Sequence, residues 1–348
     1  MLRLETEYAA GVLQQQWITS TDEYPIASAW SPNGALLVII DAQGSVYTFG
    51  ANGDLIWKSD NAHEGGALAL AMHPNRAVFA TTGQDGRGLV WSAVDGELIH
   101  TIESEHGWIE HAAWSPNGDD LAIATGRYAI VFNDTGNRMW QTDAHPSTIS
   151  ALAWSPKGEL ATACYGQVSF FDGASGAPNQ VLEWQGSMVS MELSACGDIV
   201  ACGSQDRTVH FWRRSSGEDS MMHGYRSKPT HLAFDQSSTL LATGGGDIVI
   251  VWSFANGGPE GTRPGTLKMH AEPITALDFA PDSQHLASGA RDGSVVAWSL
   301  DSNGNGMPIG TTKLPNSIAQ LQWRPDGRGI TGLDAHGNVI NWKVLSTR

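Results

Sequence analysis

Two histidines and a glutamate stand close together in the stretch HGWIEHAAWSP, residues 106–116. Imidazole and carboxylate groups are common zinc ligands, so His106, Glu110 and His111 could belong to a metal site. Their spacing, however, is one residue longer than the HxxEH zinc pattern, which also needs a helix to bring its ligands onto one face. Whether these residues do chemistry therefore depends on the elements that position them.

The composition limits the kinds of partner. The chain has 348 residues, with 20 basic and 36 acidic side chains and a formal net charge of −16. Such a surface repels phosphate backbones and anionic lipids and attracts basic proteins or peptides, so we expect neither nucleic acid nor a membrane as a partner. The three cysteines lack CxxC spacing, and no signal peptide or transmembrane run is visible. We therefore expect a cytoplasmic protein.

The phrase WSP at the end of the opening stretch belongs to an element that recurs, with substitutions, along the chain. At each copy an apolar strand meets a turn rich in Pro, Asn, Gly and Asp, and the anchoring residues are Trp30, Met72, Trp114, Trp154, Leu193, Phe234, Phe279 and Trp323. Their spacing of 39 to 45 residues indicates a repeat architecture. After each anchor we expect a small-residue strand, a tight turn, a strand that closes on an aromatic residue, and a fourth strand. Four short antiparallel strands of this kind make one propeller blade.

This repeat resembles that of the WD40 family, most closely in HAEPITALDFAPDSQHLASGARDGSVVAWSL, residues 270–300, although the closing Trp is never followed by Asp. The resemblance covers almost the whole chain and implies a ring in which the N-terminal strand completes the last blade. We predict an all-β, eight-bladed WD40-type propeller, one domain over residues 1–348 closed by a strand at 11–18. Seven blades plus an appended sheet is the alternative. The expected repeats are approximately 24–59, 63–102, 106–142, 145–184, 185–224, 225–269, 270–314 and 315–344.

The resemblance also implies a hydrogen-bonded set of His, Ser or Thr, Asp and closing Trp within a blade. Such a set makes sense physically because a buried carboxylate is costly unless it is hydrogen-bonded. The matching residues are His63, Thr81, Asp85 and Trp91 in the second repeat and His270, Ser288, Asp292 and Trp298 in the seventh. His106 and His145 stand in the equivalent loops of repeats three and four, so we expect His106 to have a structural role.

Two other histidines, His111 and His231, replace small residues on the innermost strands. A zinc site needs three or four ligands, and these two residues lie three repeats apart, so we expect no metal there. We expect each of them to hydrogen-bond a neighbouring blade. A cation site at the channel mouth, formed by His111, His231 and Glu110, is the alternative.

In the WD40 family, peptides bind mostly on one face of the ring. The positions that match this face, and that we expect to contact a partner, are Trp108, Glu110, Tyr24, Gln84, Gln205 and Arg291. Trp108 is the one tryptophan of 14 that occupies no recurring position, and interface hot spots favour Trp, Tyr and Arg. Packing of Trp108 against a neighbouring loop is the alternative.

Enzyme signatures are missing from the sequence: there is no GxSxG, P-loop, dinucleotide-binding or HExxH pattern. The expected innermost positions are mostly Ala and Ser. We therefore predict a non-catalytic scaffold without a cofactor, monomeric on its own, that binds an unidentified protein or peptide on the propeller rim. Two alternatives stay open: a metal-handling accessory protein with a His-containing channel or rim site, and a metal-dependent hydrolase or lyase with its site in the channel.

Overall fold

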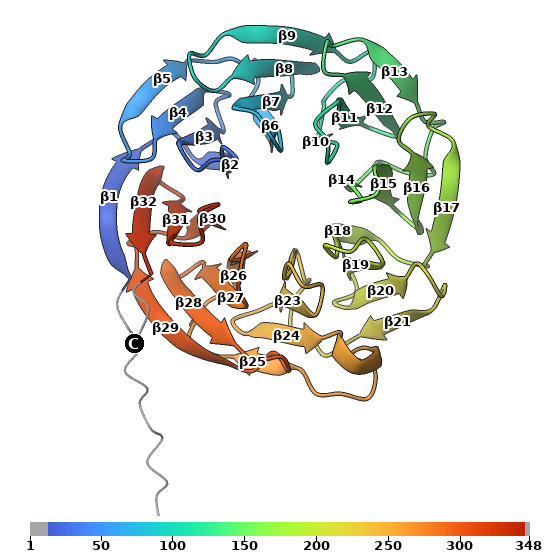
Figure 1. Ribbon diagram of the computed structural model, residues 1–348, viewed down its shortest axis with the longest axis vertical. Coiled ribbons are helices and arrows are strands. Elements are labelled where there is room, and N and C mark those ends of the chain that lie inside the picture. The colour runs from blue at the N-terminus through green and yellow to red at the C-terminus, as the bar shows by residue number, and fades with distance from the viewer. Residues whose placement is uncertain (1–12, 345–348) are drawn as a thin grey trace, which may run out of the picture.

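Eight four-stranded antiparallel sheets form a closed ring around a central channel (Figure 1). The structure, a computed structural model, describes residues 13–344. It confirms the eight-bladed propeller, and seven blades with an appended sheet was the wrong alternative. In this part of the chain the helical content is η1 (Ala255–Gly257), and no helix is long and apolar enough to cross a membrane.

In the first four blades, the strands follow one another from the channel outward. They are β2 (Pro25–Trp30), β3 (Leu36–Asp41), β4 (Val46–Gly50) and β5 (Leu55–Ser59); β6 (Ala67–Met72), β7 (Val78–Gly83), β8 (Arg87–Ser92) and β9 (Leu98–Glu103); β10 (His111–Trp114), β11 (Asp120–Thr125), β12 (Tyr128–Asn133) and β13 (Arg138–Gln141); and β14 (Ala151–Trp154), β15 (Glu159–Cys164), β16 (Gln167–Asp172) and β17 (Pro178–Glu183).

The remaining blades repeat the pattern, except that the outermost strand of blade 8 comes from the start of the chain. They are β18 (Met188–Leu193), β19 (Ile199–Ser204), β20 (Val209–Arg213) and β21 (Asp219–Met222); β22 (His231–Phe234), β23 (Leu240–Gly244), β24 (Val249–Ser253) and β25 (Gly265–Leu267); β26 (Ile274–Phe279), β27 (His285–Ala290), β28 (Ser294–Leu300) and β29 (Gly306–Lys313); and β30 (Ile318–Trp323), β31 (Gly329–Asp334), β32 (Asn338–Lys343) and β1 (Gln14–Ser20).

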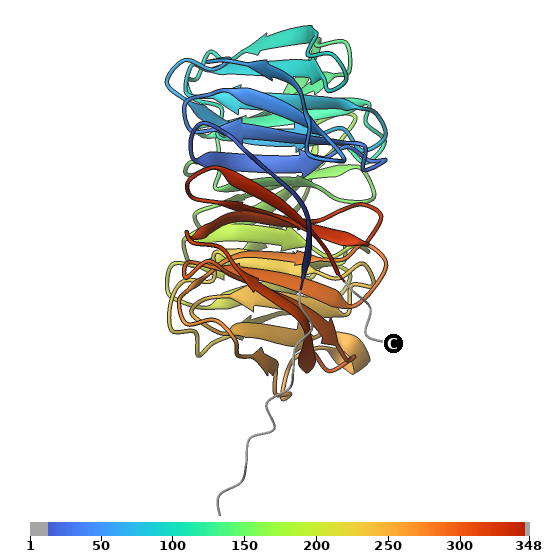
Figure 2. The ribbon, with the colours of Figure 1, turned by 90° about the vertical axis from the view of Figure 1, so that its left-hand side faces the viewer.

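The position of a strand within its blade explains its sequence. Second strands such as β7 and β19 are packed between neighbouring blades, so they are buried almost throughout and carry no polar alternation. Outer strands such as β9 face solvent and are largely exposed. Seen edge-on, the strands run across the thickness of the ring, so their turns lie on its two faces (Figure 2). We call the face with the loops before the first strands and the turns between second and third strands the upper face.

The ring closes where β1 pairs with β32, in a register that places Ile18 opposite Ile340. The strand runs from Gln14 to Ser20, later than the expected 11–18, of which residues 11 and 12 lie outside the described part. The Trp17 indole N–H donates to the carbonyl of Ala51 in blade 1 at 2.9 Å. The indole ring also lies over Gly53, where a Cβ would come within 2.7 Å of it. Trp17 therefore fastens the closing strand to blade 1.

Replacing this tryptophan tests the closure. We expect Trp17→Ala to lower the free energy of unfolding by about 2 kcal/mol, because the side chain is half-buried and its hydrogen bond is lost. Ile18→Ala, on the same strand but 57% exposed, should change it by less than about 0.5 kcal/mol. Urea unfolding of both variants measures the difference, and equal midpoints would contradict a closing role for Trp17.

Candidate functional site

The second blade contains a complete hydrogen-bonded chain of side chains. The Trp91 indole N–H donates to the hydroxyl of Thr81 at 2.9 Å, and that hydroxyl lies 2.8 Å from His63 Nε2. His63 Nδ1 lies 3.1 Å from an Asp85 carboxylate oxygen. Every group is satisfied when Nδ1 carries the proton and Thr81 donates to Nε2. Burial lowers the pKa of His63, which favours this neutral form.

The hydrogen-bonded set of the seventh blade differs from the expected one because an additional serine joins it. Trp298 donates to Ser288, which lies 2.7 Å from His270 Nε2, as in blade 2. His270 Nδ1, however, contacts the hydroxyl of Ser294, and Ser294 in turn donates to Asp292. Asp292 therefore reaches the histidine through Ser294 and not directly. Burial lowers the pKa of His270 to about 4.

Blade 3 contradicts the expectation that His106 belongs to such a set. His106 is exposed and stacks on Tyr128, with ring centroids 4.1 Å apart. The positions of the partner hydroxyl and of the closing Trp hold the apolar Ile123 and Phe132, which are buried. A buried polar chain cannot form without these partners, so the histidine is left on the surface. In blade 4, by contrast, His145 Nε2 lies 2.8 Å from a threonine hydroxyl.

Neighbouring threonines in blade 2 offer a matched test of the set. We expect Thr81→Val to lower the free energy of unfolding by about 2–3 kcal/mol, because it leaves His63 and Trp91 without a partner. Thr82 is equally buried, but its hydroxyl has no partner among the described residues, so Thr82→Val should be neutral or stabilising. Chemical unfolding of the two variants gives the comparison, and equal losses would refute the role of the set.

Blade 5 fills the same space with aromatic rings. Trp184 stacks on His210 with centroids 3.8 Å apart, and His210 meets the edge of Trp212 at 4.3 Å. His210 is buried, and neither ring nitrogen makes a hydrogen bond within the described residues, although Nε2 lies 3.2 Å from Asp219. Burial lowers the pKa of His210 to about 4, against the opposing charges of Asp219 and Asp206. The histidine is therefore held neutral between two tryptophans.

This histidine should make the protein sensitive to acid. Its pKa in the folded state lies below the ordinary value of about 6.5, so the unfolded chain binds the proton first as pH falls. The stabilising contribution is present above pH 6.5 and disappears as pH drops towards 4. We expect His210→Leu, which introduces the residue found at the equivalent Leu89, to keep stability at pH 7 and to reduce this loss.

Thermal unfolding of wild type and His210→Leu between pH 7 and pH 4 measures the effect. His223, exposed in the loop after β21, provides the control variant His223→Gln. Parallel pH profiles for wild type and His210→Leu would contradict the assignment.

The channel holds the histidines that were considered as metal ligands. His111 and His231 are half-buried, and burial lowers the pKa of each, which for His111 opposes the effects of Glu110 and the Ile149 backbone. Ile149 belongs to the loop before β14, so His111 does lie against the next blade. Among residues 13–344, no three His, Cys, Asp or Glu side chains are close enough to hold a metal ion.

Sequence reasoning missed two carboxyl groups in the channel, Glu192 and Asp278. Both stand one residue before an anchor, where five other blades carry alanine, so an alignment of the repeats could have revealed them. The backbone N–H of Trp323 in blade 8 donates to Asp278, and that of Phe234 in blade 6 to Glu192. Burial raises the pKa of Asp278 to about 7, and burial together with the charge of Asp278 raises that of Glu192 to about 8. The two groups link their blades to the next blade around the ring.

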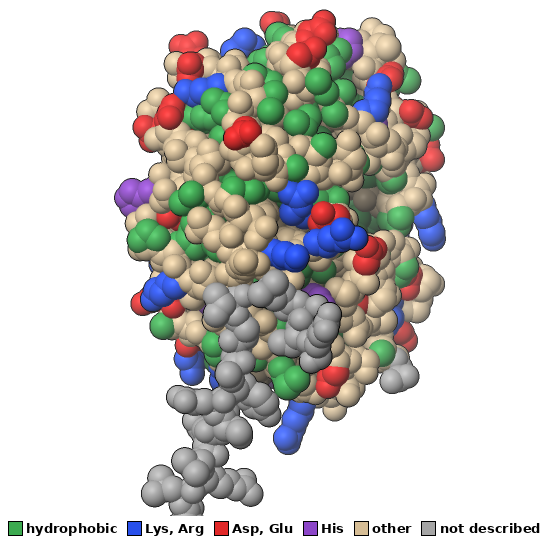
Figure 3. Space-filling model, turned by 60° about the vertical axis from the view of Figure 1, so that its left-hand side comes forward, with side chains coloured by type: hydrophobic (Ala, Val, Ile, Leu, Met, Phe, Trp, Pro, Cys, Tyr) green, Lys and Arg blue, Asp and Glu red, His purple; other side chains and the backbone are tan. Residues whose placement is uncertain are grey.

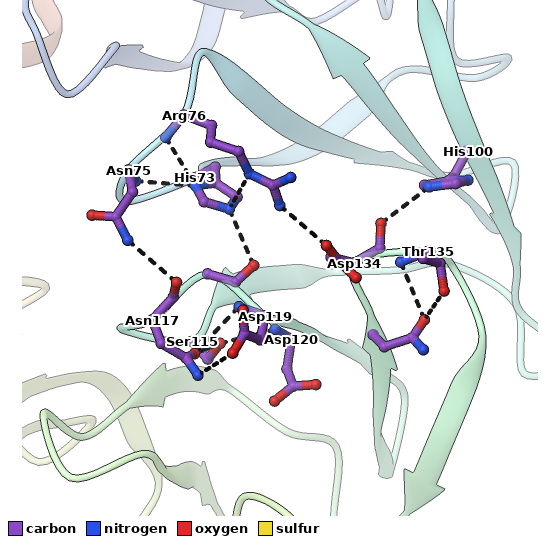
Figure 4. Close-up of polar contacts among 12 residues, drawn as sticks. His73, Asn75, Arg76, His100, Ser115, Asn117, Asp119, Asp120, Asp134 and Thr135 are labelled. Carbon is purple, nitrogen blue, oxygen red and sulfur yellow. Dashed lines mark hydrogen bonds and ion pairs between the residues drawn. The ribbon is translucent and has the colours of Figure 1, made fainter.

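Away from the upper face, a polar network joins blades 2 and 3 (Figure 4). His73 stands where other repeats carry the serine of WSP, and its Nδ1 accepts hydrogen bonds from the backbone N–H groups of Asn75 and Arg76. Its Nε2 lies 3.1 Å from the Gly118 carbonyl in blade 3, and a Cβ at Gly118 would collide with the ring. Arg76 reaches Asp134 of blade 3 at 3.6 Å. His73 and Arg76 therefore have a structural role, which is to join blade 2 to blade 3.

A cavity of about 470 Å³ lies at the seam between blades 8 and 1, and its lining includes Arg324, Arg328 and Lys343. Figure 3 brings this side of the molecule forward and shows Lys and Arg side chains gathered over the middle of the face, with acidic side chains beside them. The Arg324 guanidinium donates to the Gly34 carbonyl at 3.1 Å and lies 4.4 Å from the Trp30 ring. Arg324 therefore ties the last blade to the first.

On the upper face, the predicted contact residues divide into two groups. Tyr24 of blade 1 and Trp108 of blade 3 are 44% and 54% exposed, and Gln84 of blade 2 is half-buried. Glu110 accepts a hydrogen bond from the Gly126 N–H of its own blade at 3.1 Å, so its carboxylate also stabilises the tight turn of blade 3. Sequence reasoning missed Tyr165 in the tight turn of blade 4, which is 60% exposed. These residues occupy blades 1 to 4.

Gln205 and Arg291 lie on the other side of the ring, where the structure brings them together. Both line a cavity of about 610 Å³ that spans the upper ends of blades 5, 6 and 7. His231 lines the same cavity, and His111 is not part of its lining. In Figure 1, β10 and β26 lie across the channel from each other, which separates Trp108 from Arg291.

Comparison with protein families agrees with this architecture. A model described as WD domain, G-beta repeat matches residues 136–172, 176–213 and 261–299. A model for the anaphase-promoting complex subunit 4 WD40 domain matches residues 28–112. The chain is a WD40-repeat β-propeller. The matched repeats include blades that lack the complete hydrogen-bonded set, so this set is not required for a WD40 blade.

Relatives of this WD40 propeller are mostly much longer proteins. Telomerase protein component 1 of Mus musculus is 24% identical over 94% of the chain, which spans 12% of that protein. Autophagy-related protein 16 of Arabidopsis thaliana is 24% identical over 81% of the chain, which spans 56% of it. Echinoderm microtubule-associated protein-like 2 of Rattus norvegicus is 25% identical over 90% of the chain, which spans 43% of it. The chain therefore corresponds to a part of these relatives.

Among solved structures, the computationally designed Ika8 protein superposes with a TM-score of 0.81 at 22% identity. The match covers 95% of this chain and all of the designed one. At this identity the likeness shows the fold alone.

Proposed function

We propose that this WD40 propeller is a scaffold that binds a protein or peptide on its upper face. The observation that carries the proposal is the exposure of Trp108 and Tyr165, 54% and 60%, on the neighbouring blades 3 and 4. Large aromatic side chains held in the open by loops on a rigid sheet scaffold are typical of interface hot spots. Tyr24 adds a third exposed ring on the same face.

The comparisons support the class of function and no particular partner. The names of the relatives refer to a telomerase component, an autophagy-related protein and a microtubule-associated protein. WD40 repeats that recur in such different proteins are consistent with a scaffold whose partner is set by the surface residues of each chain. A partner for this chain must therefore be sought from its own upper face.

The mechanism we propose is rigid presentation without chemistry. The hydrogen-bonded sets and inter-blade contacts fix the blades, and thereby the positions of the loops that bear Tyr24, Trp108 and Tyr165. We keep enzyme activity and metal handling as weaker alternatives, since no cluster in the described residues favours either. A cytoplasmic location stays a prediction from the cysteine usage.

Affinity capture from lysate of the source cells tests the proposal. We expect wild type to retain a protein that Trp108→Ala/Tyr165→Ala loses, because both substitutions remove aromatic contact area on one side of the face. The matched control is Ile56→Ala/Met139→Ala, which removes side chains that are 50% and 54% exposed on the outer strands β5 and β13. The captured protein is then purified and its direct binding to each variant measured. Equal binding by all three forms would contradict the proposed surface.

A further inference from the structure

The cavity over blades 5, 6 and 7 is rich in positive charge, as is the cavity between blades 8 and 1, but it lies on the upper face. Its lining residues include three cationic side chains, Arg207, Lys228 and Arg291, and no carboxylate. All three are exposed, and none of them forms an ion pair within the described residues. A concentration of unpaired positive charge in a concave site is notable in a chain with a net charge of −16. We call this cavity the cationic pocket.

Three of the four carboxylates nearest in sequence have other partners. Asp206 accepts hydrogen bonds from the hydroxyl and N–H of Thr208, and Asp292 accepts from Ser294 and the Ala271 N–H. Asp247 pairs with Arg226 at 3.5 Å. Glu272, which precedes the lining residue Pro273, is exposed. None of these carboxylates forms an ion pair with Arg207, Lys228 or Arg291 within the described residues.

Arg207 adds an independent observation. Its φ is +68°, in the left-handed region, and it holds the turn position that glycine occupies as Gly86 in blade 2 and Gly293 in blade 7. A side chain in this conformation is disfavoured relative to glycine, and such strained residues cluster at functional sites. The turn therefore carries a less favourable backbone conformation than glycine would, and it places Arg207 in the lining of the pocket.

The pocket, with a volume of about 610 Å³, also has room for part of an extended chain. The end of β23 and the turn after it in blade 6 contribute Gly244, Gly245 and Gly246, which have no side chains to fill the space. Thr230 and Thr275 from the first-strand loops supply hydroxyl groups beside the cations. Lys228 occupies the loop position that Trp108 holds in blade 3, six residues before the anchor. The same repeat position therefore carries an exposed aromatic residue in blade 3 and a cationic residue in blade 6.

We propose that the cationic pocket binds an anionic peptide segment, whose carboxylate or phosphate groups are held by Arg207, Lys228 and Arg291. This inference rests on the proposed function, since it names the chemistry of a partner for the upper face. Arginine fits both oxyanions through paired N–H donors, and lysine adds a point charge. The predicted preference for a basic partner came from the net charge of the whole chain. The local charge of the pocket has the opposite sign and decides what binds there.

The test is the binding of labelled peptides to the full chain, followed by fluorescence anisotropy at low and at physiological salt. The probes are a glycine-serine peptide with three glutamates, the same peptide with three phosphoserines, and one with three glutamines. We expect the two anionic peptides to bind, the neutral one not to bind, and binding to weaken with salt. Comparison of the two anionic peptides shows which oxyanion is preferred.

The variants replace each cation with a residue that stands at the equivalent position of another blade, so we expect the fold to be kept. Arg207→Gly restores the turn glycine, Lys228→Ser introduces the residue of Ser187 and Ser317, and Arg291→Gln introduces that of Gln84 and Gln205. We expect the triple variant to bind at least about tenfold more weakly while unfolding at the same or a higher denaturant concentration. The control Arg138→Gln/Lys157→Ser/Arg263→Gln removes the same charge from exposed sites elsewhere and should bind like wild type.

Three results would overturn the inference: unchanged binding by the triple variant, equal binding of the neutral peptide, or no binding of either anionic peptide to wild type. Competition by inorganic phosphate as effective as that by the peptides would show a small-anion site and refute the peptide part. None of these results bears on Trp108 and Tyr165, whose variant tests the proposed function on the other half of the face.

Discussion

Closure of the ring is the constraint on which the other features depend. A four-stranded blade alone leaves its strand edges unpaired and its apolar faces in contact with water. Only neighbouring blades on both sides cover these faces. The pairing of β1 with β32 completes the last blade, and Trp17 and Arg324 bind it to the first. Once the ring is closed, the loops of one blade keep a fixed distance from those of every other blade. A surface made of residues from three blades, such as the cationic pocket, requires that rigidity.

Inside the ring, the same space in each blade is filled by different side chains. The space between the closing aromatic and the second strand holds an imidazole and a hydroxyl in blades 2 and 7, a tyrosine hydroxyl in blade 6 and stacked rings in blade 5. Blade 3 uses aliphatic residues around Ile123. Each of these sets of side chains fills the space beside the closing aromatic, and blade 5 does so although the ring nitrogens of His210 make no hydrogen bond within the described residues, so repeats can diverge without losing the fold.

The repeat period was enough to predict the number of blades, because spacing and turn chemistry are local properties of the sequence, and the resemblance to the WD40 family implied the closing pair. The error at His106 also has a local cause: Ile123 and Phe132 had already removed both partners of a buried imidazole. Ser294 was missed because serine fits many turns, and Glu192 and Asp278 because the repeats were compared at other positions. The cationic pocket could not be seen in the sequence, since Arg207, Lys228 and Arg291 meet only after blades 5, 6 and 7 pack side by side.

The register of the closing pair has a consequence for synthesis on the ribosome. Ser20 pairs with Asn338, so more than three hundred residues must be added before β1 finds its partner. At about 5–20 residues per second this takes roughly 15–60 s. Throughout that time β1 lacks its partner β32, and the blades that follow form beside it as an open arc. The edge of β1 is thus open to wrong pairing during translation, and the arrival of β32 ends that exposure.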